Sequence, residues 1–144
     1  MKRVLIINGP NLNLLGKREI ETYGTKNVSD IEKDCRIIAK QNNLDVQFFQ
    51  SNSESEIINA IQNSNNCQFL IINAGALTHT SIAIYDALKV LKIPIIEVHI
   101  SNVYKREDFR KNSFISPIAS GIIIGFGTSV YELAIESLKY FETE

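Results

Sequence analysis

Both histidines of the chain follow a short apolar run, and polar side chains surround each of them. Residues 73–81, NAGALTHTS, contain His79, and residues 97–102, EVHISN, contain His99. Histidine titrates near neutrality, so it can accept or donate a proton during a reaction. A lone histidine at the end of a strand is more often a hydrogen-bonded structural residue. Catalysis is therefore favoured only if other reactive side chains converge with these two.

Basic residues follow the second histidine. Arg106 and Arg110, with Lys105 and Lys111 beside them, form a local cluster that suits an anionic small molecule. Taken alone, two arginines four residues apart would more commonly form a solvated helix face. The formal net charge of the whole chain is −1, which predicts neither nucleic-acid binding nor attraction to a membrane.

A long connection follows the first apolar run, over residues 9–26. It contains three glycines, a proline, two asparagines and no sustained period. Such a connection in a compact domain is usually functional, often as a lid. This one contains Asn11, Arg18 and Tyr23. Each alone has an ordinary structural explanation as a loop anchor, but together they would face the same edge of a sheet as the histidines.

Nucleotide binding is not indicated by the glycine spacing. A phosphate loop has four residues between its glycines and a hydroxyl residue after its lysine. Here six residues separate Gly9 from Gly16, and Arg18 follows Lys17. The later pair, Gly125 and Gly127, lacks the third glycine of a dinucleotide motif.

A metal site and a redox pair are also not indicated. Asp86 or Glu97 could join the histidines as a ligand, but neither spacing resembles a zinc motif. Cys35 and Cys67 have no CxxC spacing and are expected to be small buried hydrophobic residues in a reducing compartment. We therefore expect no metal and no cofactor.

The elements that must position these residues alternate along the chain. Five β-branched runs cover residues 3–8, 45–50, 68–73, 95–100 and 118–125, and helical periodicity covers residues 29–41, 53–64, 80–91 and 129–141. Most runs are apolar on consecutive positions, which is typical of parallel strands covered on both faces. The second helical segment opens with Ser53-x-x-Glu56, a capping-box pattern.

This alternation predicts one α/β domain over residues 1–144, with residues 9–26 as a lid. The expected architecture is a flavodoxin-like three-layer sandwich around a five-stranded parallel sheet of order 2-1-3-4-5. Ligands of such sheets bind beyond the carboxyl ends of the strands, where the polar residues above lie. No apolar stretch approaches the ~20 residues of a membrane span, and no signal peptide is indicated, so we expect a soluble cytoplasmic protein.

Three blocks of this sequence closely resemble type II 3-dehydroquinate dehydratase, and the resemblance spans essentially the whole chain. The blocks are NGPNLNLLG from Asn8, with Arg18 and Tyr23; NAGALTHTSIA from Asn73; and EVHISN from Glu97, with REDFR from Arg106. The resemblance implies a hydro-lyase of the shikimate pathway of aromatic amino acid biosynthesis. It would remove water from 3-dehydroquinate by anti elimination through an enolate, giving 3-dehydroshikimate without a cofactor.

The resemblance also implies roles for individual residues. The catalytic residues would be the base Tyr23, the residue Arg18 that keeps it ionised, the acid His99, and Asn11, which positions a water at the enolate oxygen. Tyrosine is mostly protonated at neutral pH, but one arginine at ~4 Å offers roughly 4 kcal/mol in a partly screened site, which is sufficient in size. Substrate-binding residues would be Asn73, His79, Asp86, Ile100, Ser101 and Arg110, with Glu97 and Arg106 in support.

The resemblance further implies a homododecamer, a tetramer of trimers, in which Asp86 reaches the site of a neighbouring subunit. Two positions depart from the commoner family residues: Ala74 replaces a frequent proline, and Tyr85 replaces a frequent arginine. Two alternatives stay open at this stage. One is a flavodoxin-like module that binds a nucleotide or flavin, since a fold does not fix a function. The other is a relative that has lost activity, although none of the proposed catalytic residues is missing.

Overall fold

One parallel sheet forms the centre of the molecule. The computed structural model describes residues 1–141, so the predicted domain of residues 1–144 includes three residues outside the described part. The strands are β1 (Lys2–Asn8), β2 (Leu44–Gln50), β3 (Phe69–Asn73), β4 (Ile95–His99) and β5 (Gly121–Ile124). Their order is β2-β1-β3-β4-β5, and every neighbouring pair is parallel. The predicted fold class and strand order are confirmed.

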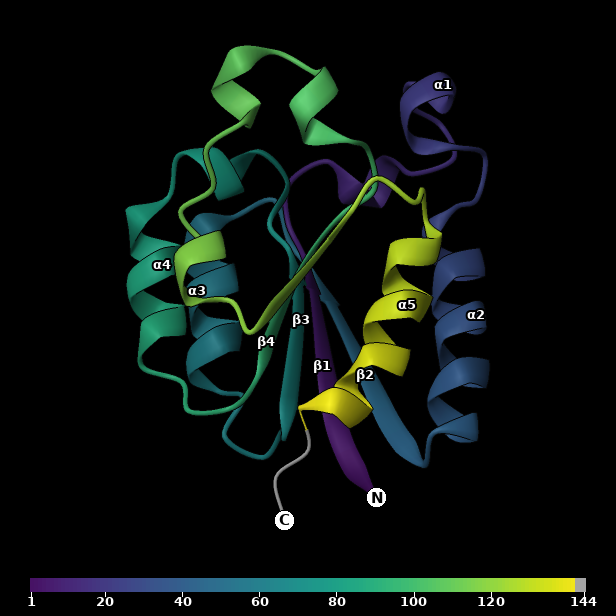
Figure 1. Cartoon of the computed structure of the whole chain (residues 1–144), viewed down its shortest axis with the longest axis vertical. Helices are drawn as coiled ribbons and strands as arrows, with labels where there is room; N and C mark the ends of the chain where they lie inside the picture. The colour runs from purple at the N-terminus through teal and green to yellow at the C-terminus, as the bar shows by residue number, and fades with distance from the viewer. Residues whose placement is uncertain (142–144) are drawn as a thin grey trace.

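Helices cover both faces of this sheet (Figure 1). Helices α2 (Val28–Gln41) and α5 (Ser129–Ser137) lie on one face, and α3 (Glu54–Gln62) and α4 (Ile82–Lys89) lie on the other. Successive side chains of a strand point to opposite faces. Val4 and Ile6 of β1 accordingly belong to one hydrophobic core, and Leu5 and Ile7 belong to the other. The apolar runs of consecutive residues therefore reflect two cores, one on each face.

Most predicted boundaries agree closely with the structure, but the last strand was predicted too long. Residues 118–125 were expected to be extended, whereas Ser116–Ile118 forms a 3₁₀ turn and β5 begins at Gly121. Pro117 lies within that turn, and sheet pairing starts only at Ser120, whose N–H donates to Ile95 O. The last helical segment is also shorter than predicted, because a 3₁₀ turn over Leu138–Tyr140 follows α5.

The helix N-termini differ in part from the sequence pattern. Ser53 caps α3 by accepting from the Glu56 N–H at 3.4 Å, but the Glu56 carboxylate accepts from Ser51 Oγ instead of returning to Ser53. The Ser53–Glu56 capping box is thus only half formed. A reciprocal capping box begins α2 instead, where Asn27 and Asp30 each accept from the other's backbone N–H.

Residues 9–26 were expected to be a long connection with no sustained period, but they contain two short regular elements. A 3₁₀ turn spans Leu12–Leu14, and the one-turn helix α1 spans Ile20–Tyr23. Leu12, Leu15 and Tyr23 are buried and belong to the hydrophobic core. Three apolar side chains therefore fix this segment over the end of the sheet (Figure 1).

Two glycines allow the connections after β1 and β3 to pack backbone against backbone. Gly9 N donates to Asn73 O at 2.8 Å, and a Cβ on Gly9 would lie 2.3 Å from Ala74 O. Gly75 has φ +59°, and a Cβ there would lie 3.0 Å from Pro10 O. The beginning of the 9–26 segment is thereby held against the connection that carries His79.

No helix within residues 1–141 is long and apolar enough to cross a membrane.

Candidate active site

A cavity opens at the carboxyl ends of β1, β3 and β4. The connections that follow these three strands meet at that end of the sheet (Figure 1). All predicted site residues except Asp86 and Glu97 line it: Asn11, Arg18, Tyr23, Asn73, His79, His99, Ile100, Ser101, Arg106 and Arg110. Parallel strands direct their carboxyl ends to one edge, which is why segments so distant in sequence meet there.

The Tyr23 hydroxyl lies between two guanidinium groups. Arg106 Nη1 donates to Tyr23 Oη at 2.7 Å, and Arg18 Nη2 donates to the same oxygen at 3.3 Å. Arg18 also stacks over the tyrosine ring, with its guanidinium carbon 4.4 Å from the ring centre. Guanidinium groups only donate, so the phenol oxygen accepts in both contacts. The family resemblance implies Arg18 as the residue that keeps Tyr23 ionised, but Arg106 lies closer to the Tyr23 oxygen.

Arg18 and Arg106 each have a second partner that orients them. Arg18 Nη2 also lies 3.2 Å from Glu19 Oε1, and Arg106 Nη1 also donates to Ser101 Oγ at 3.3 Å. Glu19 precedes α1, whereas Ser101 follows β4. The two cations therefore approach Tyr23 from different parts of the fold.

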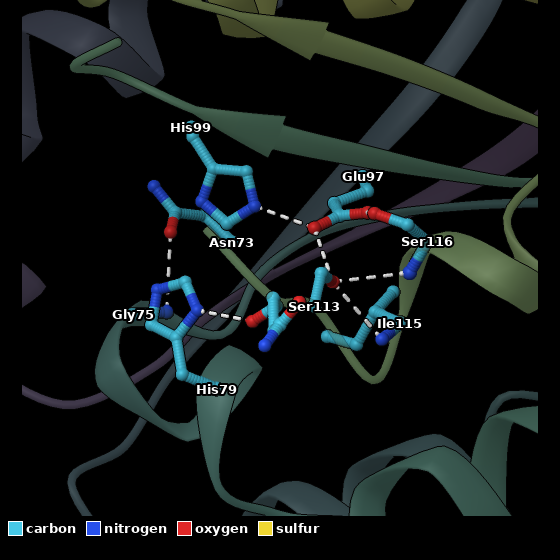
Figure 2. Close-up of polar contacts among 9 residues, drawn as sticks. Asn73, Gly75, His79, Glu97, His99, Ser113, Ile115 and Ser116 are labelled. Atoms are coloured by element: carbon cyan, nitrogen blue, oxygen red, sulfur yellow. Dashed lines mark hydrogen bonds and ion pairs between the residues drawn. The ribbon is translucent and has the colours of Figure 1, made fainter. Parts of the chain in front are cut away.

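His99 and Glu97 form a buried pair on β4. His99 Nε2 lies 2.6 Å from Glu97 Oε2, and the two side chains are 7% and 1% exposed. Burial pushes the pKa of Glu97 upward, but hydrogen bonds from His99, Ser116 and Ser113 outweigh it and hold the pKa below its ordinary value. Glu97 is therefore a carboxylate that contacts the His99 ring (Figure 2), and it does not line the cavity itself.

His79 is held as a neutral imidazole. Its Nδ1 lies 2.7 Å from Asn112 O, and because a carbonyl oxygen only accepts, Nδ1 carries the proton. Burial is the main cause that lowers the pKa of His79, and the neighbouring His99 and Arg110 lower it further. The unprotonated Nε2 is thus an acceptor. The rings of His79 and His99 lie 6.2 Å apart and nearly parallel.

Asn73, the last residue of β3, is oriented by groups that sequence analysis did not identify. Its Nδ2 donates to Tyr131 Oη at 3.1 Å, and its Oδ1 accepts from Gly75 N at 3.2 Å. The Tyr131 hydroxyl in turn donates to Asn8 Oδ1 at 2.6 Å. Tyr131 is fully buried on α5, where helical periodicity alone indicates only an apolar core position.

Arg110 and Asn11 are the remaining polar side chains of the cavity. Arg110 is half-buried, and its Nε donates to Glu107 Oε2 at 2.6 Å. Asn11 has φ +70°, and its backbone N–H donates to Asn52 Oδ1 at 2.9 Å. Asparagine tolerates this left-handed conformation better than most residues, and the contact with Asn52 anchors the Asn11 backbone where this residue lines the cavity.

Two predicted residues do not line this cavity, for different reasons. Glu97 lies behind His99, as described above, whereas Asp86 is exposed on α4.

The two positions that depart from the commoner family residues are Ala74 and Tyr85. Ala74 is buried with φ −76°, within the range that proline adopts, so the alanine leaves the backbone path unchanged. Tyr85 is half-buried, and Lys89 Nζ lies 5.7 Å from its ring centre.

Within residues 1–141, no three His, Cys, Asp or Glu side chains lie together as a set that could hold a metal ion. Cys35 and Cys67 are free cysteines and both are buried, as predicted. Burial raises the pKa of Cys35 to about 12, so its thiol stays protonated at neutral pH.

Comparisons with known proteins agree with this geometry over nearly the full length. A family model described as "Dehydroquinase class II" matches residues 2–139. A 3-dehydroquinate dehydratase of Prochlorococcus marinus strain MIT 9301 is 57% identical over 139 residues, which is 96% of this chain and 95% of the relative. One from Francisella tularensis subsp. novicida is 52% identical over 138 residues, with 95% and 94% covered.

The crystal structure of a type II dehydroquinase from Butyrivibrio crossotus superposes on this chain with a TM-score of 0.93 at 44% identity. The superposition covers 96% of this chain and 97% of that one.

Proposed function

The chain belongs to the class II dehydroquinase family, and from that premise we propose how its residues carry out the reaction of a 3-dehydroquinate dehydratase. The enzyme is a hydro-lyase that removes water from 3-dehydroquinate. The chemistry requires a base for a carbon-bound proton next to a ketone, an acid for the departing hydroxyl, and groups that hold an anionic substrate.

Tyr23 is the base in this proposal. It takes the proton from the carbon next to the ketone, and the electrons of that C–H bond form an enolate. Support comes from the two arginine contacts to its oxygen, at 2.7 Å from Arg106 and 3.3 Å from Arg18. Both cations favour negative charge on that oxygen, and a phenolate is a strong enough base for a weakly acidic C–H bond.

His99 is the acid. As the enolate collapses, the carbon–oxygen bond to the leaving hydroxyl breaks and a carbon–carbon double bond forms. His99 gives its proton to that hydroxyl, which departs as water. The buried carboxylate of Glu97 at 2.6 Å supports this role, because it stabilises the protonated imidazole before the transfer.

The remaining side chains bind the substrate and the developing charge. Arg110 and the backbone N–H groups of Ile100 and Ser101 hold the carboxylate, since a guanidinium matches a carboxylate in geometry and charge. Neutral His79 accepts from a substrate hydroxyl through Nε2, which its contact with Asn112 O leaves unprotonated. Asn11 positions a water that donates to the enolate oxygen.

The wider context of the enzyme also belongs to this proposal. The reaction serves the shikimate pathway in the cytoplasm, and the active form is a dodecamer built from four trimers. Asp86 then reaches the site of a neighbouring subunit. Its exposed position on α4, outside the cavity of its own chain, is compatible with that role.

The observation that carries the proposal is the presence, in one cavity, of a tyrosine oxygen between two guanidinium groups and a histidine backed by a buried carboxylate. Purified protein mixed with 3-dehydroquinate should produce the ultraviolet absorbance of the conjugated enone product, at a rate proportional to enzyme concentration. A rate no greater than the background would overturn the proposal. The alternative of a flavin- or nucleotide-binding module is not favoured, because the close relatives are dehydratases.

A further inference from the structure

Ser113 has a hydroxyl proton with a single available direction. Its Oγ accepts from the backbone N–H groups of Ile115 and Ser116, both at 3.0 Å. A serine hydroxyl offers two acceptor lone pairs and one proton. Both lone pairs are thus engaged, and the proton points to Glu97 Oε2 at 2.8 Å (Figure 2).

Glu97 receives donors on both of its oxygens. Ser116 Oγ donates to Oε1, while Ser113 Oγ and His99 Nε2 lie against Oε2. The Ser113 oxygen has no lone pair left to accept a proton, so Ser113 can only donate to Glu97. The hydrogen bonds at both carboxyl oxygens hold the pKa of Glu97 below its ordinary value despite its burial. At 1% exposure Glu97 is therefore a carboxylate that accepts every contact.

This arrangement decides which nitrogen of His99 carries which proton. Since Glu97 only accepts, Nε2 must be an N–H donor across the 2.6 Å contact. Glu97 does not line the cavity, whereas His99 does. Figure 2 shows the two ring nitrogens on opposite sides of the imidazole, with one directed at Glu97. Nδ1 is therefore the nitrogen left for the substrate.

We propose that Ser113 and Ser116 are positioning residues of the dehydratase reaction. They hold Glu97 as a carboxylate that only accepts, which fixes the Nε2 proton of His99 and makes Nδ1–H the group that protonates the leaving hydroxyl. The reactive form of the pair is then an imidazolium beside a carboxylate, and it becomes a neutral imidazole with its proton on Nε2 after the transfer. This inference rests on the dehydratase function proposed above.

The segment that carries these serines also contacts the other histidine. Asn112 O holds His79 Nδ1 at 2.7 Å, and Phe114 N donates to Thr78 O at 2.9 Å. The charged and titratable groups that line the cavity with His99 are His79 from the turn after β3, Arg18 and Tyr23 from the segment after β1, and Arg106 and Arg110 from the segment after β4. None of them is altered in the variants that test the proposal.

The pH dependence of kcat in Ser116→Ala tests the positioning role. The variant removes one donor to Glu97 and leaves the Ser113 bridge to the backbone intact. Loss of a hydrogen bond to a charged group predicts a fall of kcat by about 10-fold. Glu97 then takes up a proton more readily, so the acid limb of the kcat profile should move to higher pH. KM should stay within roughly twofold, because Arg110 and His79 are untouched.

Two further variants separate this role from a general effect of losing a buried hydroxyl. Ser64→Ala is the matched control. The Oγ of Ser64 is buried and donates to Ile61 O, and Ser64 lies just after the end of α3, far from the cavity. This variant should keep the wild-type kcat and acid limb. Ser116→Thr retains the hydroxyl and should restore most of the activity. If the acid limb of the kcat profile lies at the same pH in Ser116→Ala and Ser64→Ala, the proposal is overturned.

The protonation of the ring is measured on the wild-type protein by nitrogen NMR of labelled histidine. In the neutral form of His99 the ring should carry its proton on Nε2, and a neutral ring with its proton on Nδ1 would overturn the proposal. Wild-type turnover keeps the two proposals distinguishable. An inactive wild-type enzyme would contradict the proposed function, whereas an active enzyme with the other tautomer would contradict only the positioning role.

Discussion

Arg106 Nη1 lies 2.7 Å from Tyr23 Oη, closer than the 3.3 Å of Arg18 Nη2 to the same atom. The two residues of the shorter contact are 83 positions apart in the chain. Tyr23 belongs to α1 after the first strand, and Arg106 follows the fourth. The base of the proposed reaction is therefore assembled by two connections, and the segment after β4 contributes to both the base and the acid.

The Arg106 contact predicts a loss of turnover at least as large as that caused by removing Arg18. Arg106→Ala removes the shorter charge-assisted hydrogen bond, which should lower kcat by about 10- to 100-fold. Steady-state kinetics of Arg106→Ala and Arg18→Ala, side by side, test this. Lys105→Ala removes an exposed neighbouring charge and is the control. If kcat of Arg106→Ala stays within twofold of wild type, Arg18 alone supports Tyr23.

Tyr131 is predicted to contribute to both stability and catalysis. Tyr131→Phe removes the hydroxyl that joins Asn73 Nδ2 to Asn8 Oδ1, so two buried polar side chains lose a partner. The free energy of unfolding should fall by about 1–3 kcal/mol, and kcat/KM should fall because Asn73 is less well oriented. Burial raises the pKa of Tyr131, so its hydroxyl stays protonated in this role.

Urea denaturation and steady-state kinetics measure both effects of the Tyr131 substitution. Tyr140→Phe is a matched control, because Tyr140 is 77% exposed. Unchanged kinetics in Tyr131→Phe would show that Asn73 keeps its orientation without this hydroxyl.

The lowered pKa of Glu97 predicts that the folded protein loses stability in acid. Its pKa is lower in the folded protein than the ordinary 4.5, so the unfolded chain binds the proton more readily. Its contribution to stability is therefore complete above pH 4.5 and is lost as the pH falls through the lower folded pKa. Glu97→Gln should reduce the dependence of the unfolding free energy on pH in this acid range.

Urea denaturation at several pH values between neutrality and the acid limit measures that dependence. Glu136→Gln, on the exposed side of α5, controls for the removal of one carboxylate. Equal slopes for wild type and Glu97→Gln would contradict the assignment of Glu97 as a buried carboxylate.

The close approach of Gly9 to the backbone of Ala74 predicts that a larger residue at position 9 destabilises the fold. In Gly9→Ala the added Cβ meets Ala74 O at 2.3 Å, a backbone atom that cannot move independently. Overpacking of this type should lower the unfolding free energy by about 1–3 kcal/mol. In Gly121→Ala the new contacts are side-chain atoms of Phe141 and Ile96 at 3.3 and 3.4 Å, which can adjust. Thermal denaturation should therefore give the larger loss for Gly9→Ala, and the reverse order would contradict this account.

Much of the fold was predictable because most strands are apolar runs flanked by polar residues. Neighbouring strand residues such as Ile6 and Ile7 point to opposite faces of the sheet, and both are buried. Burial on both faces indicates a parallel sheet covered by helices on each side. The last strand was less predictable. It lies at the edge of the sheet and pairs only with β4, so apolar residues before it, such as Ile118, belong to a turn instead.

The sequence predicts the site residues that lie at or just after the carboxyl ends of the strands. Asn73 and His99 end β3 and β4, and His79 lies in the turn after β3, so the convergence of all three follows from the topology. The distances between connections were not predictable, because the position of Arg106 relative to Tyr23 depends on how two irregular segments pack. The orienting serines were not predictable either: Ser113 lies in an irregular connection and Ser116 begins a short 3₁₀ turn, and sequence periodicity carries no information about their partners.

The role of Tyr23 as the base is the central claim, and the turnover of Tyr23→Phe with 3-dehydroquinate tests it most directly. Phenylalanine keeps the ring that packs in the core and under Arg18, so the cavity should stay formed. Circular dichroism and substrate binding close to wild type would verify this. Removing a general base should lower kcat by about 100- to 10,000-fold. Turnover near that of the wild-type enzyme would contradict the account.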